Sequence, residues 1–333
     1  MSFIQAGVKS VGQIRNLSLF ATLFVLALLY ATASIAFRKQ GFASMQVFSN
    51  LLGDNAFLGI AAVGMTFVIL SGGIDLSVGS MMAFTTIFVA KTIGAGTHPL
   101  LAILGALAFG GVFGASMGYL IDRFELPPFL VTLGGMFFAR GMAFVVSTES
   151  IGIEHPMYTQ VQGFGLPLGG VVVLPVTALL LLMIFLFGIY LAHYTRFGRT
   201  VYAVGGSESS ARLMGLPVGS TKVIVYALNG FLAALAGVVS SVYMGSGDPV
   251  RGAGFELDVI ASVVIGGTLL TGGVGTIAGT LAGVLIFGTI KTALDFHGEL
   301  NSWWLRIVVG VLLLLFILFQ RFLSRTSPQL KST

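Results

Sequence analysis

Long apolar runs that are almost free of charge dominate this chain. Only 9% of its 333 residues are charged and 56% are hydrophobic, whereas a soluble domain carries roughly 25% charged residues. The chain therefore lacks the polar groups that would cover a water-facing surface. Because a membrane helix takes about 20 residues, we predict an all-α, polytopic integral membrane protein of about ten transmembrane helices. Residues 1–333 are expected to form a single transmembrane domain.

The apolar runs also predict where the spans lie and how they are oriented. Lys and Arg concentrate before the first run, between the sixth and the seventh, and after the last. Because cytoplasmic loops are enriched in these residues, both termini and residues 194–222 are expected on the cytoplasmic side, with Arg38 and Lys39 as the exception. The eighth run is short, and whether it crosses fully is left open. The expected spans are residues 17–37, 50–70, 77–95, 99–121, 128–147, 169–193, 222–243, 256–271, 274–293 and 303–320.

Composition excludes several kinds of chemistry. The chain has no Cys, which excludes disulfides and thiolate metal sites, and its four His are scattered. No Lys follows a Gly, so the chain has no Walker A loop for ATP. The basic residues lie in short segments between apolar runs, which argues against nucleic acid as a partner. We therefore predict no catalytic residue, no cofactor and no metal site.

The sequence GASMG at residues 114–118 matches the GxSxG pattern of serine hydrolases, but it lies inside an apolar run. A nucleophile elbow requires a sharp turn from a strand to a helix. The small residues of this match are therefore expected to form a helix-packing face.

A short motif recurs at a separation of 200 residues. Residues 70–74 read LSGGI and residues 270–274 read LTGGV, and Gly79-Ser80 align with Gly279-Thr280. The conservative pairs indicate a weak internal duplication, with chance matches between glycines as the alternative. Duplicated segments are typical of transporters with a central pathway. The sequence leaves open whether the two copies are parallel or inverted.

The longest basic segment, residues 194–222, is also amphipathic. It reads YTRFGRTVYAVGGSESSARLMGLPVGSTK, with Ala203, Ala211, Met214 and Leu216 as apolar positions among polar ones. One interpretation is a plain surface helix. The other is a short coupling helix that inserts into a groove on a separate ATPase. The stretch between Gly205-Gly206 and Gly215 has the length that such docking requires.

Polar residues inside or near the apolar runs are candidates for a translocation path or a gate, because charges are costly in lipid. Asp75 follows a Gly-Gly pair, where it either caps the next helix at Ser77 or takes part in the path. Arg140 is expected to face the bundle with a carboxylate or a backbone carbonyl as its partner. Glu256 and Asp258 lie near the outer end of the eighth run, where they either meet a soluble partner or are solvated. Helix-to-helix hydrogen bonds explain the remaining candidates equally well, and these are Asn55, Thr66, Thr132, Asn229 and Thr268.

Three segments together resemble the membrane permeases of bacterial ABC sugar importers of the ribose and galactose type. They are residues 55–80 (NAFLGIAAVGMTFVILSGGIDLSVGS), residues 194–222 and residues 256–279 (ELDVIASVVIGGTLLTGGVGTIAG). The stretch GGIDLSVGS is the most specific part, and the resemblance covers nearly the whole chain. It implies a permease domain in the bacterial inner membrane that is not itself an enzyme. The implied partners are a cytoplasmic ABC ATPase with duplicated nucleotide-binding domains, a second, related permease, a periplasmic sugar-binding protein and membrane lipid.

By the same resemblance, residues 194–222 form the cytoplasmic coupling loop. The family usually has Asn where this chain has Ser207, and a small apolar residue where it has Ser210. Docking is expected to survive both changes. The expected ATPase-coupling positions are Arg196, Gly198, Gly205, Gly206, Ala211 and Gly215. The expected positions for translocation or gating are Asp75, Asn55, Thr66, Arg140, Asn229 and Thr268, and those for docking of the binding protein are Glu256 and Asp258.

Two further segments are similar to one permease subunit of the galactofuranose importer. They are residues 128–158 (PFLVTLGGMFFARGMAFVVSTESIGIEHPMY) and Asn301-Ser302-Trp303-Trp304. Ribose and galactopyranose remain the alternative sugars. An ion-coupled secondary transporter would need a membrane-embedded carboxylate cluster or a His relay, and the chain offers mainly the isolated Asp75. A channel or a structural membrane protein is disfavoured by the amphipathic 194–222 segment.

Overall fold

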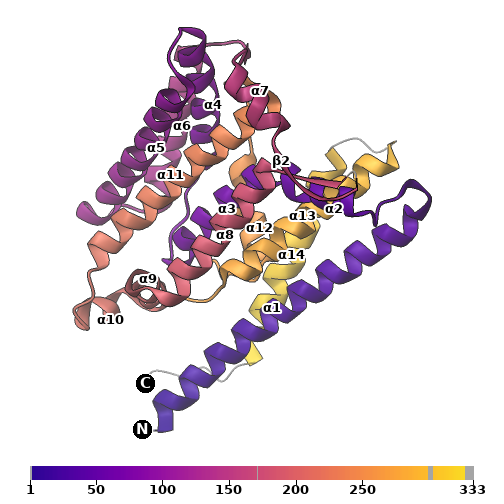
Figure 1. The fold of residues 1–333 in the computed structure, drawn as a ribbon. Helices are drawn as coiled ribbons and strands as arrows, with labels where there is room; N and C mark the ends of the chain where they lie inside the picture. Colours follow the sequence, from indigo (N-terminus) through magenta and orange to yellow (C-terminus); the bar gives the residue numbers. More distant parts are fainter. Residues whose placement is uncertain (1, 171, 299–302, 327–333) are drawn as a thin grey trace.

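The computed structural model describes residues 2–170, 172–298 and 303–326, and these residues are mostly helical, as predicted (Figure 1). Asn301 and Ser302 of the C-terminal motif lie outside the described residues. The helices are α1 (Ser2–Ala36), η1 (Arg38–Gln40), α2 (Met45–Asp54), α3 (Ala56–Leu70), α4 (Val78–Gly94), α5 (Pro99–Arg123), α6 (Pro128–Val146), α7 (Pro156–Gly163), α8 (Val176–Tyr194), α9 (Arg196–Gly206), α10 (Glu208–Leu213), α11 (Val218–Met244), α12 (Phe255–Ile265), α13 (Ile277–His297) and α14 (Trp303–Thr326). The strands are β1 (Ile151–Gly152), β2 (Gly165–Gly169), β3 (Val172–Pro175) and β4 (Ser246–Gly247).

Six helices in the described part of the chain are long and apolar enough to cross a membrane, namely α1, α5, α6, α8, α11 and α13. Helices α2 and α3 together give a seventh candidate that is bent by 54°. The helical part of the eighth expected span, α12, has only 11 residues and is roughly 16 Å long. The hydrocarbon core of a bilayer is about 30 Å thick, so α12 alone does not cross it.

The helix observed in the region of the expected span 169–193 begins later than the apolar run does. Strands β2 and β3 pair as an antiparallel hairpin, in which Leu166 lies opposite Leu174. Helix α8 starts only at Val176, directly after Pro175. The prediction of a helix from residue 169 was therefore wrong, because an apolar run does not distinguish a short hairpin from the first turns of a helix.

The start of α1 lies at the same end of the molecule as α9 and α10, whereas α7 lies at the opposite end (Figure 1). The 194–222 segment and the N-terminal end of the first helix therefore share one side, as the distribution of Lys and Arg predicts.

Helices α5 and α11 approach each other through glycines. A Cβ atom at Gly110 would lie 2.6 Å from the carbonyl oxygen of Gly230, and one at Gly114 would collide with the carbonyl oxygen of Tyr226. One turn further on, a Cβ atom at Gly118 would lie 2.8 Å from the Cα of Val223. Glycines four residues apart share one face of a helix and let two backbones touch. The predicted packing role of residues 114–118 is confirmed.

The two copies of the repeated motif run in the same direction. Helix α13 is antiparallel to α3, because Asn55 lies beside Gly288 whereas the hydroxyls of Thr66 and Thr280 are 2.8 Å apart. Helix α13 is also antiparallel to α12, because Gly283 lies against the carbonyl of Ser262 and Gly279 against that of Gly266. Helices α3 and α12 are therefore parallel. Each ends in a break at a Gly-Gly pair, before α4 and α13 respectively.

The α5–α11 contact predicts a sharp difference between two neighbouring glycines. Gly114→Ala places a methyl group on the backbone of α11, and overpacking of this kind costs about 1–3 kcal/mol. Gly111→Ala is the matched control, since its Cβ atom would only meet the Cβ of Phe231 at 3.9 Å. We expect a lower melting temperature in detergent for Gly114→Ala and an unchanged one for Gly111→Ala. Equal melting temperatures for the two variants would contradict this packing.

Candidate functional site

The two Gly-Gly breaks and the end of α9 meet at one junction. The Gly273 amide donates a hydrogen bond to the carbonyl oxygen of Leu70 at 2.9 Å. A Cβ atom at Gly205 would collide with the same carbonyl oxygen, and one at Gly272 would lie 3.0 Å from both the Cα of Gly72 and the carbonyl oxygen of Gly205. Gly72 and Gly272 have φ angles of 86° and 84°, which glycine adopts without strain. Three distant segments are therefore in backbone contact.

A side chain of α9 adds a second link to this junction. The Tyr202 hydroxyl donates a hydrogen bond to the carbonyl oxygen of Gly275 at 2.9 Å. Gly275 belongs to the break between α12 and α13. Helix α9 is thus attached to this break by a side chain as well as by its terminal glycines.

The 194–222 segment folds into two short helices with side-chain caps. The Thr195 hydroxyl accepts a hydrogen bond from the Gly198 amide at 3.1 Å and caps α9. The Ser207 hydroxyl accepts one from the Ser210 amide at 3.3 Å and caps α10. Ser and Asn are both favoured at this position of a helix, so Ser207 performs the capping that an Asn would perform.

The expected coupling residues divide into inward-facing and exposed positions. Ala211 is fully buried against Val204 and Val218, and Gly198 packs on the backbone of Leu191 and Ala192. Arg196, at the start of α9, is exposed. Gly215 has a φ of 74° and ends the turn after α10. The apolar side chains that the segment presents outward are those of Leu213 and Met214, which are 89% and 68% exposed.

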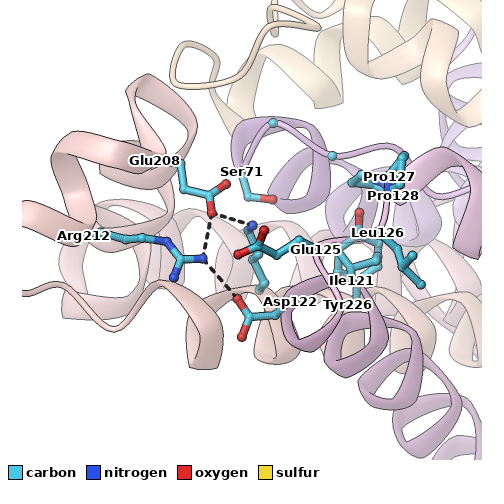
Figure 2. A pocket seen from close by; sticks show the side chains of 13 residues that line it. Ser71, Ile121, Asp122, Glu125, Leu126, Pro127, Pro128, Glu208, Arg212 and Tyr226 are labelled. Carbon is cyan, nitrogen blue, oxygen red and sulfur yellow. Dashed lines mark hydrogen bonds and ion pairs between the residues drawn. The ribbon is translucent and has the colours of Figure 1, made fainter.

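A network of charged side chains links α10 to α5 and α11. The Glu208 carboxylate accepts hydrogen bonds from Arg212 at 3.0 Å and from Lys222 at 2.8 Å. Arg212 also lies 3.6 Å from the carboxylate of Asp122. Figure 2 shows Arg212 between Glu208 and Asp122, on one side of a pocket. The network holds α10 to the neighbouring ends of α5 and α11.

This pocket, of about 560 Å³, opens between α10 and the break after α3 (Figure 2). The charged network forms one wall and apolar residues that include Leu126 and Pro127 form another. The full lining is Ser71, Gly72, Gly73, Ile121, Asp122, Glu125, Leu126, Pro127, Pro128, Glu208, Arg212, Lys222 and Tyr226.

Asp75 lies in the break between α3 and α4 and is fully buried. Its Oδ1 accepts hydrogen bonds from the Ser77 amide at 2.8 Å and the Ser77 hydroxyl at 2.7 Å. Its Oδ2 accepts one from the Asn229 side-chain amide at 2.8 Å. The capping contact with Ser77 that the sequence suggested is present. The contact with Asn229 also ties the break to α11.

Arg140 holds a non-helical stretch of chain. Its guanidinium donates hydrogen bonds to the carbonyl oxygens of Pro249 at 2.7 Å and Arg251 at 2.9 Å. These carbonyls belong to the stretch between β4 and α12. Non-helical backbone at membrane depth requires such partners inside the protein. Arg140 therefore faces the bundle and has backbone carbonyls as its partners.

The two acidic candidates of α12, Glu256 and Asp258, do not lie on a freely exposed surface. A Cβ atom at Gly79 would collide with the Glu256 carboxylate, and Glu256 Oε2 is buried. Asp258 is half-buried. A docking role for these residues stays a prediction.

The remaining polar candidates lie apart from one another. The Asn55 amide donates to the carbonyl of Leu51 at 2.8 Å, and Thr66 bonds to Thr280. Thr132 donates to the carbonyl of Ile74 at 3.2 Å and so lies beside the Asp75 break. Thr268 is fully buried next to Gly275. Of these candidates, Asp75, Asn229 and Thr132 meet at one break, whereas Asn55 and Thr66 serve other helix contacts.

Sequence reasoning missed the pocket residues Asp122, Glu208 and Tyr226 as a group. They come from three elements, so no spacing along the chain indicates that they meet. One weak signal for this group was present in the sequence, because the carboxylates of Asp122 and Glu125 come directly after the fourth apolar run. Among the described residues no three His, Asp or Glu side chains are arranged to hold a metal ion.

Residues 47–317 match the family described as the permease component of branched-chain amino acid transport systems. The chain is 53% identical over 313 residues to the inner membrane ABC transporter permease protein YjfF of Escherichia coli strain K12, covering 93% of each chain. It is 39% identical to the fructose import permease protein FruG of Bifidobacterium longum, covering 82% of each chain. It is 38% identical to the ribose import permease protein RbsC of Escherichia coli strain K12, covering 88% of this chain and 91% of that one. No solved structure matches the chain.

The junction predicts opposite behaviour for adjacent glycines of α9. Gly205→Ala forces the carbonyl of Leu70 and the Gly273 amide apart, whereas a Cβ atom at Gly206 meets nothing within 4 Å. We expect Gly205→Ala to lower the melting temperature and to expose α9 to limited proteolysis. The matched Gly206→Ala should behave as the wild type. A Gly205→Ala protein with wild-type stability and protection would show that the contact is dispensable.

The charged network predicts a pH-dependent effect. Burial raises the pKa of the Glu208 carboxyl, but hydrogen bonds from Lys222 and Arg212 outweigh burial and hold the pKa below its usual range. The stabilisation is therefore present above about pH 4.3, the ordinary Glu pKa, and is lost as the pH falls through the lower folded value. Glu208→Gln should lower stability at pH 7 by about 0.2–1 kcal/mol, as for exposed ion pairs.

Thermal unfolding of Glu208→Gln and wild type across pH 3–8 checks this expectation. The difference should shrink toward acidic pH. Glu149→Gln is the control, because Glu149 is exposed and takes part in none of the ion pairs found among the described residues. A Glu208→Gln effect that is constant with pH would rule out the charge as its cause.

Proposed function

We propose that this chain, which belongs to the family of branched-chain amino acid transport system permease components, is the membrane permease of an ATP-driven, binding-protein-dependent galactofuranose importer. It is an integral membrane protein and a transport subunit, and ATP hydrolysis takes place on a separate subunit. The sugar would pass from the periplasm to the cytoplasm.

A sugar is favoured over an amino acid as the substrate. The family description names branched-chain amino acids, but two similar permeases are named for fructose and ribose. The name of the YjfF relative gives no substrate. Galactofuranose rests on the similarity of residues 128–158 and Trp303-Trp304 to one permease of the galactofuranose importer. Ribose and galactopyranose are the alternatives.

The observation that carries the mechanism is the contact of Gly205 with both helix breaks. We place α9 and α10 against the cytoplasmic ATPase, with the exposed Leu213 and Met214 as the apolar side chains that enter its groove. When ATP closes the ATPase, α9 moves, and its end moves Leu70 and Gly273 with it. The breaks then shift relative to the helices that follow them, and access alternates between the two sides of the membrane.

The remaining partners follow from this arrangement. A periplasmic sugar-binding protein would dock at the end of the molecule that carries α7, opposite to α9 and α10 (Figure 1). A second, related permease would complete the pathway. Both termini of the chain would then lie in the cytoplasm, as its Lys and Arg distribution predicts.

An ion-coupled mechanism is not favoured by the surroundings of Asp75. Its two carboxylate oxygens accept three hydrogen bonds from Ser77 and Asn229. Within the described residues it is not part of a carboxylate cluster. A proton or sodium relay would need such a cluster.

Uptake of labelled galactofuranose in cells that carry or lack this chain tests the proposal. The cells also express the ATPase, the second permease and the binding protein, and ribose and galactopyranose are competitors. We expect uptake to be lost when this chain is deleted, and also when the Walker A Lys of the ATPase is replaced, because ATP closure drives the cycle.

The outcomes separate the substrate from the mechanism. Loss of ribose uptake with unchanged galactofuranose uptake would overturn the substrate and keep the ATP-driven permease. Uptake that survives an inactive ATPase would overturn the mechanism.

A further inference from the structure

Two buried polar atoms of residues that line the pocket between α10 and the break after α3 make no hydrogen bond in the described part of the chain. Tyr226 is 1% exposed, and its hydroxyl has no hydrogen-bond partner among the described residues although the side chain lines the pocket. One buried oxygen of Asp122 also lacks a hydrogen bond, with Arg212 at 3.6 Å as its nearest cation. Buried polar groups in native proteins are nearly always hydrogen-bonded. Two such groups around one cavity indicate a polar molecule that binds there.

The backbone around the pocket is strained at one residue. Glu125 has a φ of 50° and is the one residue other than glycine with a positive φ in the described part of the chain. It lines the pocket in the turn between α5 and α6. Residues held in such conformations persist only where the surrounding structure fixes them, and they concentrate at active sites and ligand sites.

The chemistry of the lining selects a class of ligand. Three carboxylates and two cations surround the cavity, so the walls carry a net negative charge and disfavour anions. Carboxylates accept hydrogen bonds, Arg and Lys donate them, and a tyrosine hydroxyl does both. Hydroxyls that donate and accept at once suit this mixture, and the apolar wall at Leu126 and Pro127 suits C–H groups. The volume of about 560 Å³ lies within the range of about 300–1,000 Å³ that is usual for small ligands.

We propose that this pocket is a monosaccharide-binding site in the permease itself, where the sugar contacts the Tyr226 hydroxyl and the Asp122 carboxylate. The inference rests on the proposed function, since it takes the transported sugar as the ligand. The site opens at the end that carries α9 and α10. The sugar would occupy this site as it leaves the pathway, and its binding there does not require the binding protein.

The position of the site has a consequence for the transport cycle. Its lining joins Gly72 and Gly73 of the break to Glu208 and Arg212 of α10. A sugar in the pocket therefore contacts the break after α3 and helix α10 at the same time.

Binding to the intact transporter tests the proposal. The two permeases and the ATPase, in lipid nanodiscs without the binding protein, are titrated with methyl galactofuranoside, D-ribose, D-galactose and L-leucine, and binding is followed by saturation-transfer NMR. We expect saturable binding of at least one sugar. Tyr226→Phe removes a single hydroxyl and should weaken it about fivefold, the usual worth of one hydrogen bond. Asp122→Asn, the second variant, should also weaken it.

Tyr158→Phe is the matched control, because Tyr158 is buried and its hydroxyl lies 3.2 Å from that of Ser241, outside the pocket. It should bind sugar as the wild type does. Three results would overturn the site. They are absence of saturable binding to the wild type, sugar affinities of Tyr226→Phe and Asp122→Asn that equal the wild-type affinity, and preferential binding of L-leucine. Uptake is measured separately, in cells that express the same wild-type complex together with the binding protein. Uptake without pocket binding would overturn only this inference, whereas absence of monosaccharide uptake would overturn the proposed function.

Discussion

Backbone groups inside a membrane must find hydrogen-bond partners within the protein, and this requirement organises the structure around its two helix breaks. The break after α3 and the break after α12 satisfy part of the requirement with each other, through the Gly273 amide and the Leu70 carbonyl. Thr22 of α1 donates to the carbonyl of Ile265 at the end of α12. The breaks are therefore stable only where several elements converge, and α9 is one of those elements.

Charged side chains inside the bundle serve the same need. Asp75 receives the amide of Ser77 where α4 begins, and Arg140 donates to two carbonyls of the non-helical stretch before α12. Each charge stands beside irregular backbone, and the nearby carboxylates of Glu256 and Asp248 also attract Arg140. The salt bridges found among the described residues lie at the α10 end, where Glu208 holds Arg212 and Lys222. Ionic contacts and backbone contacts therefore hold different parts of the 194–222 segment.

Local patterns predicted much of the fold. The apolar runs located most helices, the 200-residue repeat located both breaks, and the spacing of Asp75 and Ser77 predicted their contact, because each depends on neighbours in the chain. The β2–β3 hairpin was missed, since hydropathy does not distinguish it from helix, whereas the short length of the eighth run had left open whether it crosses fully. The pocket was also missed. Its side chains come from separate elements, and only the packing of α5 on α11 brings Asp122 and Tyr226 to one cavity.

The junction at Gly205 is built from main-chain atoms, and this determines its mechanical character. A contact between two long side chains yields when it is pushed, because rotamers change before the backbone moves. Gly205 has no side chain and Leu70 takes part through its carbonyl group, so no change of rotamer can absorb a displacement at this contact. A displacement of the end of α9 would therefore pass directly to the backbone of both helix breaks, with little loss in side-chain rearrangement.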